Sequence, residues 1–356
     1  METIFVSIAS YRDVLCSTTI SDLYNKAKNP ENIFVGICQQ NKEDDTDCVS
    51  PDFQFRKNIS IIKLKHTDAK GPTWARYICS TLYNGQDYFL QIDSHTLFAK
   101  DWDIKLINMI KTIQINSDNK NIILSHYPRG YEDIITNETD DDVTSIHKCL
   151  YNERGMISMD GARFRKKESL PTKNAFVAAG FIFAPSKWLQ DVPFDPTLDY
   201  LFVGEEMLLA ARTFTSGWDV FTPNDNIVYH KYTREKENKI WNDIKYSDDK
   251  AFEKTKIILK LKEIPENLDE ETKLEIQKYG LGVVRPLEDF YKLIGFDINT
   301  RTCGATEIEF YKQPSSCYAN NQYLKIISII IFIIIFSLFS YFLYKYIIYR
   351  ETNINQ

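Results

Sequence analysis

Short apolar runs alternate with longer segments of helical periodicity along most of the chain. The runs are rich in Ile, Val and Phe and too short for helices, so they predict β-strands over residues 4–9, 33–38, 59–64, 88–93 and 178–184. Helices are predicted over residues 18–28, 72–82 and 205–215, and a turn followed by a strand over residues 221–230. This alternation predicts an α/β fold with a parallel, doubly wound sheet, whose ligands bind at the carboxyl ends of the strands.

Two charged segments interrupt this alternation. Residues 131–145 are acidic and predict an exposed loop, which is either a solvated surface or a contact for an acceptor. Residues 233–278 are charged and predict helices.

The most apolar segment is residues 326–344, which contain no charged side chain. At about 1.5 Å per residue, a helix of this length crosses the ~30 Å hydrocarbon core of a bilayer. The alternative is a buried core helix. We therefore expect a globular domain (1–300), a juxtamembrane stalk (301–324), a transmembrane helix (325–345) and a short tail (346–356). A span so near the C-terminus predicts a tail anchor, with the globular domain in the cytosol.

Composition narrows the classes of protein that the chain can belong to. Its 356 residues are 44% hydrophobic and 26% charged, which excludes a largely disordered chain. The formal net charge of −6 argues against a nucleic-acid partner, because phosphate affinity comes mainly from clustered Lys and Arg. The seven cysteines are scattered and form no C-x-x-C pair, which argues against a zinc ribbon and agrees with a reducing compartment.

The first candidate site follows the predicted strand that ends at Asp93. Residues two apart in extended backbone point to the same side, so Asp93 and His95 could meet one cation. A carboxylate and an imidazole suit Mn²⁺ or Mg²⁺ bound jointly with a phosphate ligand. The alternative is an aspartate that caps the next turn beside a surface histidine.

Three further groups carry candidate chemistry. Glu205 and Glu206 open a predicted helix, where they either favour the helix dipole or face a cleft and handle a hydroxyl or a developing positive charge. His230 ends a predicted strand and is either a third metal ligand or a surface or core residue. Arg234 could hold diphosphate oxygens, and Arg76 either meets a phosphate or pairs with an acid.

The order of several segments resembles the family of cytoplasmic hydroxyproline N-acetylglucosaminyltransferases. The resemblance covers roughly residues 2–300 and rests on SIASYRD, GPTWARY, QIDSHTLF, AAGFIFAPSKW, PFDPTLDYLFVGEE and FTPNDNIVYHKYTR. In this comparison the D-S-H triplet stands for the metal-binding D-x-D signature. The resemblance implies a Rossmann-like GT-A nucleotide-sugar transferase fold for the globular domain, and retention of anomeric configuration.

The resemblance also implies ligands and residue roles. The donor would be UDP-N-acetylglucosamine (UDP-GlcNAc), with Mn²⁺ or Mg²⁺ as the cofactor and a protein hydroxyl of hydroxyproline, Ser or Thr as the acceptor. The implied roles are metal binding for Asp93, His95 and His230, uridine or donor contacts for Ser7, Ala9, Arg12 and Arg76, and acceptor or sugar contacts for Glu205 and Glu206. The family has no tail anchor, so the apolar C-terminus departs from its pattern.

Three alternatives to this activity stay open. The donor could be UDP-galactose or UDP-glucose. A different class is a catalytically inactive nucleotide- or glycan-binding membrane protein, against which the intact Asp93, His95 and Glu206 argue. A metal-dependent phosphohydrolase would need a denser carboxylate cluster than one D-x-H triplet provides.

Overall fold

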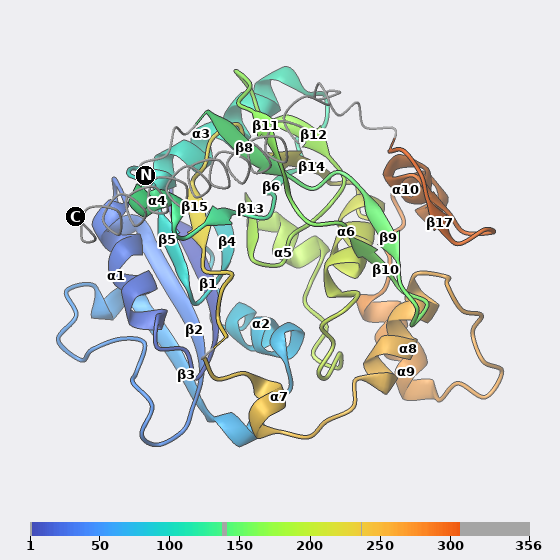
Figure 1. Ribbon diagram of the computed structural model, residues 1–356, viewed down its shortest axis with the longest axis horizontal. Helices are drawn as coiled ribbons and strands as arrows, with labels where there is room; N and C mark the ends of the chain where they lie inside the picture. The colour runs from blue at the N-terminus through green and yellow to red at the C-terminus, as the bar shows by residue number, and fades with distance from the viewer. Residues whose placement is uncertain (1, 137–140, 236, 307–356) are drawn as a thin grey trace, which may run out of the picture. The chain divides into compact units, whose positions relative to one another are not determined.

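A mixed eight-stranded sheet forms the centre of the molecule (Figure 1). The computed structural model describes residues 2–136, 141–235 and 237–306. The strand order is β12–β14–β6–β13–β4–β1–β2–β3. The bounds of these strands along the chain are β1 Ile4–Tyr11, β2 Ile33–Asn41, β3 Ile59–Lys65, β4 Tyr88–Asp93, β6 Ile122–Ser125, β12 Thr172–Asn174, β13 Phe181–Pro185 and β14 Asp219–Thr222.

The strand directions correct the expectation of a parallel sheet. β1, β2, β3 and β4 are parallel, and so are β6 and β14. β13 runs antiparallel to both β4 and β6, and β12 antiparallel to β14. An alternation of apolar runs does not fix direction, and only strands joined by a crossover connection have to be parallel. The chain enters β13 from a loop, so this strand is free to reverse.

Helices cover the sheet and bury its apolar side chains. Four of the helices around it are α1 (Cys16–Lys26), α2 (Pro72–Ser80), α3 (Trp102–Asn116) and α6 (Glu205–Thr215). α2 packs against β1 and β2, and α3 packs against β6. The buried side chains form two large clusters, one of which includes β1, β2 and α3 residues and the other residues of α6 and of α10 (Leu287–Ile294). This apolar burial is the main term that stabilises the fold.

Smaller elements complete the described chain. A three-stranded sheet has the order β5–β15–β7. The bounds are β5 Thr96–Phe98, β7 Arg129–Gly130, α4 Asp133–Thr136, β8 Asp142–Ser145, β9 Cys149–Tyr151, β10 Ile157–Met159, β11 Arg163–Lys166, α5 Lys187–Asp191, β15 Val228–His230, α7 Ile240–Asp243, α8 Asp249–Ile258, α9 Glu270–Tyr279, α10 Leu287–Ile294, β16 Phe296–Asp297 and β17 Thr302–Cys303, with short 3₁₀ turns at Pro30–Asn32, Arg56–Asn58 and His66–Asp68.

Most of the predicted elements are confirmed, and one is wrong in part. The four N-terminal strands and the helix over residues 205–215 are present. The expected loop over residues 131–145 contains α4 and β8, and β8 pairs with β11. Its mostly polar side chains gave no strand signal, although Val143, Thr144 and Ser145 are buried where β8 pairs with the non-consecutive strand β11.

The expected membrane helix and tail anchor are corrected. Within residues 2–136, 141–235 and 237–306, no helix is long and apolar enough to cross a bilayer. The segment behind the expectation, residues 325–345, lies outside the described residues, as do most of the expected stalk and the tail. The described residues form an α/β fold, and no membrane-spanning helix is found among them.

The cysteines also differ from the expectation of a reduced chain. Cys16 is disulfide-bonded to Cys48, and Cys149 to Cys303. The partners are separated by 32 and 154 residues, so their spacing gave no sign of the pairing. Each bond closes a long loop of the unfolded chain, which favours the folded state.

Candidate functional site

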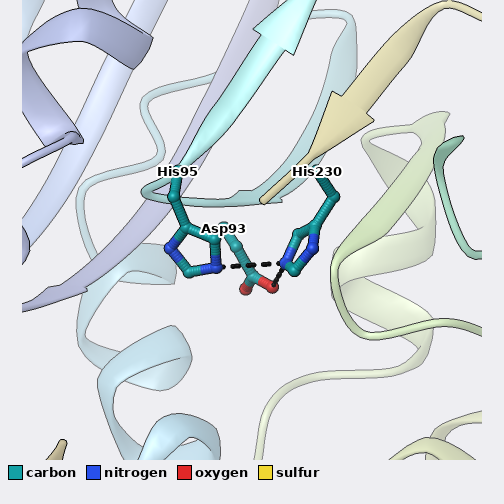
Figure 2. Close-up of side chains that lie close together, drawn as sticks. All are labelled: Asp93, His95 and His230. Atoms are coloured by element: carbon teal, nitrogen blue, oxygen red, sulfur yellow. Dashed lines mark hydrogen bonds and ion pairs between the residues drawn. The ribbon is translucent and has the colours of Figure 1, made fainter. Parts of the chain in front are cut away.

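Two strands from different sheets bring the site together. Asp93 is the last residue of β4, and His95 follows two positions later. His230 is the last residue of β15, and it lies opposite Thr96 because β15 pairs antiparallel with β5. The three side chains point toward one another (Figure 2). Residues far apart in sequence thus meet at the carboxyl end of a central strand, where α/β sheets bind ligands.

The three side chains offer a donor set for a divalent cation. His230 Nε2 lies 3.0 Å from Asp93 Oδ2 and 3.0 Å from His95 Nε2. One candidate ligand atom from each residue lies within 4.8 Å of the others. Imidazole nitrogen and carboxylate oxygen together suit transition-metal ions such as Mn²⁺. The arrangement fits a bound cation, because both imidazoles and the carboxylate turn candidate ligand atoms toward the same point (Figure 2).

Asp13 supports His95 from behind. Its Oδ2 lies 2.7 Å from His95 Nδ1 and also accepts hydrogen bonds from Ser94 Oγ (2.7 Å) and Arg234 (3.2 Å). Burial alone would raise the pKa of Asp13, but the hydrogen bond with His95 and the charges of His95 and Arg234 lower it to about 2. An ionised Asp13 holds the proton on Nδ1 and leaves Nε2 of His95 free as a ligand. Sequence reasoning missed Asp13, whose only signal was a carboxylate just after the first strand.

Arg76 connects Asp93 to Glu205. The guanidinium donates to Asp93 Oδ1 at 3.1 Å and to Glu205 Oε1 at 2.5 Å. The side chains of Arg76 and Glu205 are only 7% and 4% exposed, so each needs the other as a partner. Burial would raise the pKa of Asp93, but hydrogen bonding with His230 and the charge of Arg76 keep it well below its usual range. Asp93 is therefore held as an anion and fixed in direction.

Glu206 occupies a separate polar cluster. Its carboxylate accepts hydrogen bonds from the Tyr127 hydroxyl and from the Ala179 backbone N–H at 2.9 Å. Burial raises the pKa of Glu206 to about 7, although both hydrogen bonds favour the ionised form. This carboxyl group therefore changes charge near neutral pH. Tyr127 and Ala179 gave no separate signal in the sequence.

Gly180 lets β13 approach the candidate cation site. A Cβ atom at this position would lie 3.0 Å from Asp93 Oδ2 and 3.9 Å from His230 Cδ2. Contacts of 3.0 Å are tighter than almost all real Cβ contacts, so any side chain would displace the Asp93 carboxylate.

We predict that Gly180→Ala weakens Mn²⁺-dependent UDP binding roughly tenfold, since small misplacements of a site group have large effects. Isothermal titration of UDP at saturating Mn²⁺ measures this affinity. Gly161→Ala is the matched control, because a Cβ atom at Gly161 meets nothing within 4 Å. Equal affinities for the two variants would contradict the prediction.

A cavity of about 350 Å³ adjoins the three candidate ligands. Of the residues predicted from the sequence, it is lined by Ala9, Arg76, Asp93, His95, His230 and Arg234. Ser7, Arg12, Glu205 and Glu206 are not among its lining residues. Ser7 is fully buried within β1, and Arg12 forms ion pairs with Asp45 and Asp243.

The class of protein follows from a sequence comparison. In the structure, a central strand of the sheet ends in a carboxylate–imidazole cluster beside a cavity. The sequence model of the family Glycosyltransferase (GlcNAc) matches residues 3–55 and 51–300. The chain therefore belongs to this family.

One of the solved structures that the chain matches is similar to it in fold. The crystal structure of GalNAc-T7 with UDP, GalNAc and Mn²⁺ has a TM-score of 0.57 at 13% sequence identity, and the match covers 85% of this chain and 58% of that chain. The crystal structure of S. aureus TarS, residues 1–349 in complex with UDP-GlcNAc, has a TM-score of 0.47 at 14% identity, and the match covers 83% of this chain and 71% of that chain. No curated protein matches the sequence. The chain thus spans little more than half of the GalNAc-T7 chain, and the likeness concerns the fold alone.

Proposed function

We propose that the protein is a metal-dependent, retaining glycosyltransferase that moves N-acetylglucosamine from UDP-GlcNAc to a protein hydroxyl of hydroxyproline, Ser or Thr. The observation that carries the proposal is the convergence of Asp93, His95 and His230 at the wall of one cavity. Membership of the GlcNAc glycosyltransferase family supports it, and GalNAc-T7, which shares the fold, was crystallised with UDP and Mn²⁺.

The donor would bind with its diphosphate at the candidate cation site. Asp93, His95 and His230 would hold the cation, which would supply positive charge to the phosphate oxygens as UDP leaves. Arg234 lines the same cavity, and its guanidinium lies 3.4 Å from His95 Nε2, so it would add a second positive charge there. Asp13 keeps both His95 and Arg234 in place.

The transfer would run on one face of the sugar. The bond from the anomeric carbon to the phosphate oxygen breaks, the acceptor hydroxyl oxygen bonds to that carbon, and the hydroxyl proton passes to a phosphate oxygen of UDP. This route depends on positioning more than on a strong base.

Neither acidic residue at the start of α6 lines the cavity, which favours supporting roles for both. Glu205 would act through Arg76 on Asp93, and Glu206 through Ala179 on the strand beside Asp93. A transient covalent bond from either carboxylate to the sugar is the less favoured route, because it needs direct access to the anomeric carbon.

The proposed function predicts that the purified full chain releases UDP from UDP-GlcNAc only with a divalent cation, and faster with an acceptor peptide. The assay compares UDP-GlcNAc, UDP-GalNAc, UDP-galactose and UDP-glucose, each with Mn²⁺, Mg²⁺ or EDTA. Peptides containing hydroxyproline, Ser, Thr or only Ala distinguish the acceptors, and the anomeric proton of the product reports retention. Preference for another sugar would correct the donor. Release that no peptide accelerates would indicate hydrolysis, and no nucleotide binding at all would sink the proposal.

A further inference from the structure

One wall of the cavity is a segment that lacks buried side chains of its own. Residues 238–246 include α7 and contribute Asn238, Lys239, Ile240, Trp241 and Tyr246 to the cavity lining. Every residue from 238 to 246 is half-buried or exposed. Trp241 is 54% exposed and Tyr246 is 37% exposed. With so little apolar burial, the segment depends on a few specific contacts for its position.

Two of these contacts are aromatic and lie across the cavity rim. Tyr246 stacks on Tyr200 with ring centroids 4.5 Å apart, and Trp241 meets Phe202 edge-on at 6.5 Å. All four rings line the cavity. Such ring pairs contribute only about 0.5–1.5 kcal/mol each beyond the area that they bury. These two ring pairs help to position the segment. Their contribution to its stability is small, because the segment has no fully buried side chain.

The remaining contact is ionic and comes from the end of β1. Arg12 donates to Asp243 at 2.8 Å, and the Tyr11 hydroxyl donates to the same carboxylate oxygen at 2.8 Å. The side chains of Arg12 and Asp243 are 13% and 21% exposed, so water screens this pair less than a surface pair. Figure 1 shows α7 below α2 in this view, on the connection from β15 to α8.

A second aspartate, Asp45, holds the Arg12 side chain in the orientation in which it contacts Asp243. Asp45 accepts from Arg12 Nε at 2.8 Å and from a terminal nitrogen at 3.2 Å, which holds the guanidinium plane in a bidentate pair. The Arg12 backbone has φ of 47°, a conformation that is costly for a residue with a Cβ atom. The backbone N–H of Arg12 donates to the Gln40 carbonyl at 3.1 Å, which helps to maintain it.

We propose that Arg12 is a positioning residue that fastens the 238–246 segment over the cavity through Asp243. The proposal rests on the proposed function for its consequence. A fastened segment keeps Trp241 and Tyr246 against the rim, so the nucleotide-sugar meets a formed cavity and the reacting bond is shielded from water. A loosened segment would bind the donor less well and let water compete with the acceptor.

The test uses Asp243→Asn and Arg12→Lys, which remove the charge or the fork geometry with little change in size. Asp248→Asn is the matched control, because Asp248 forms a bidentate pair with Arg154 at 2.7 and 2.9 Å beyond the same segment. Neither Asp248 nor Arg154 lines the cavity. We expect Asp243→Asn and Arg12→Lys to raise KM for the donor roughly tenfold, the fold-change that corresponds to one charged hydrogen bond. The share of donor lost to hydrolysis should rise, and Asp248→Asn should change neither quantity.

Hydrogen exchange of the 238–246 amides measures the fastening without any catalysis. Faster exchange in Asp243→Asn than in both wild type and Asp248→Asn supports the proposal. Unchanged exchange in Asp243→Asn overturns it, and so does an equal increase in Asp248→Asn, which would mean a general loosening. If exchange responds as expected but wild type binds no UDP, the fastening stands and the proposed function fails.

Discussion

Asp93→Asn is expected to abolish Mn²⁺-dependent UDP binding and glycosyl transfer while the protein stays folded. The substitution keeps the size of the side chain but removes the only carboxylate among the three candidate ligands. It also takes one of two acidic partners from the buried Arg76 guanidinium, which retains Glu205. Loss of a supporting residue alone costs a metal site 10- to 100-fold in affinity, so loss of a charged ligand should cost at least about 100-fold.

Titration calorimetry of UDP in Mn²⁺ and in EDTA measures the effect of Asp93→Asn. Asp219→Asn is a suitable control, because Asp219 is likewise an aspartate paired with an arginine, Arg285, at 2.8 Å, and it does not line the cavity beside Asp93. Circular dichroism should show the same fold for both variants. If Asp93→Asn keeps the wild-type affinity for UDP in Mn²⁺, Asp93 is not a metal ligand.

The sequence predicted what depends on neighbouring residues. β1, β2 and β4 contain short apolar runs and are largely buried in the sheet, whereas the edge strand β3 mixes apolar with polar side chains and is only partly buried. Asp93 and His95 were paired on the expectation that residues two apart in extended backbone point to one side, although β4 ends at Asp93 and His95 lies in the bend that follows. His230 lies 135 residues after His95, and its pairing with them depends on the β5–β15 ladder. His230 was predicted as a metal ligand because it ends a predicted strand, and because it lies in one of the segments whose order resembles the family.

Features that depend on distances across the fold could not be predicted. Asp13 supports His95 only because β1 lies beside β4 in the sheet. Gly180 matters because β13 reverses direction and passes Asp93. The two disulfides and the ion pairs of Arg12 likewise join residues whose separation in sequence carries no information.

Sequence reasoning could not distinguish the roles of Glu205 and Glu206 either. Adjacent carboxylates in a helix sequence look equivalent, yet one pairs with Arg76 and the other with Tyr127 and Ala179. Because successive helical residues point about 100° apart, two neighbours enter different environments. Glu206 is the one whose pKa burial raises to about 7, and it therefore predicts a pH dependence.

Glu206→Gln is expected to lower kcat about 10- to 100-fold and to remove a pH dependence near 7, while UDP affinity changes less than about threefold. Because the pKa of Glu206 is raised, the wild-type carboxyl is protonated below pH 7, and only the anion accepts both the Tyr127 and Ala179 hydrogen bonds. The wild-type kcat should therefore rise between pH 6 and 8. Glutamine cannot ionise, so its profile should be flat there. UDP affinity is spared because Glu206 does not line the cavity.

The raised pKa of Glu206 also determines whether the free energy of unfolding rises or falls with pH. The raised folded-state pKa means that the unfolded chain loses its proton first, so the free energy of unfolding falls as pH rises from about 4.5 to 7. The loss is at most about 3 kcal/mol for this residue. Urea unfolding at pH 5 and pH 8 should show a smaller decrease for Glu206→Gln than for wild type. An inflection in kcat near pH 7 that persists in Glu206→Gln would assign it to another group. Lower turnover combined with higher stability at pH 8 would instead identify Glu206 as a buried charge that the fold retains for function.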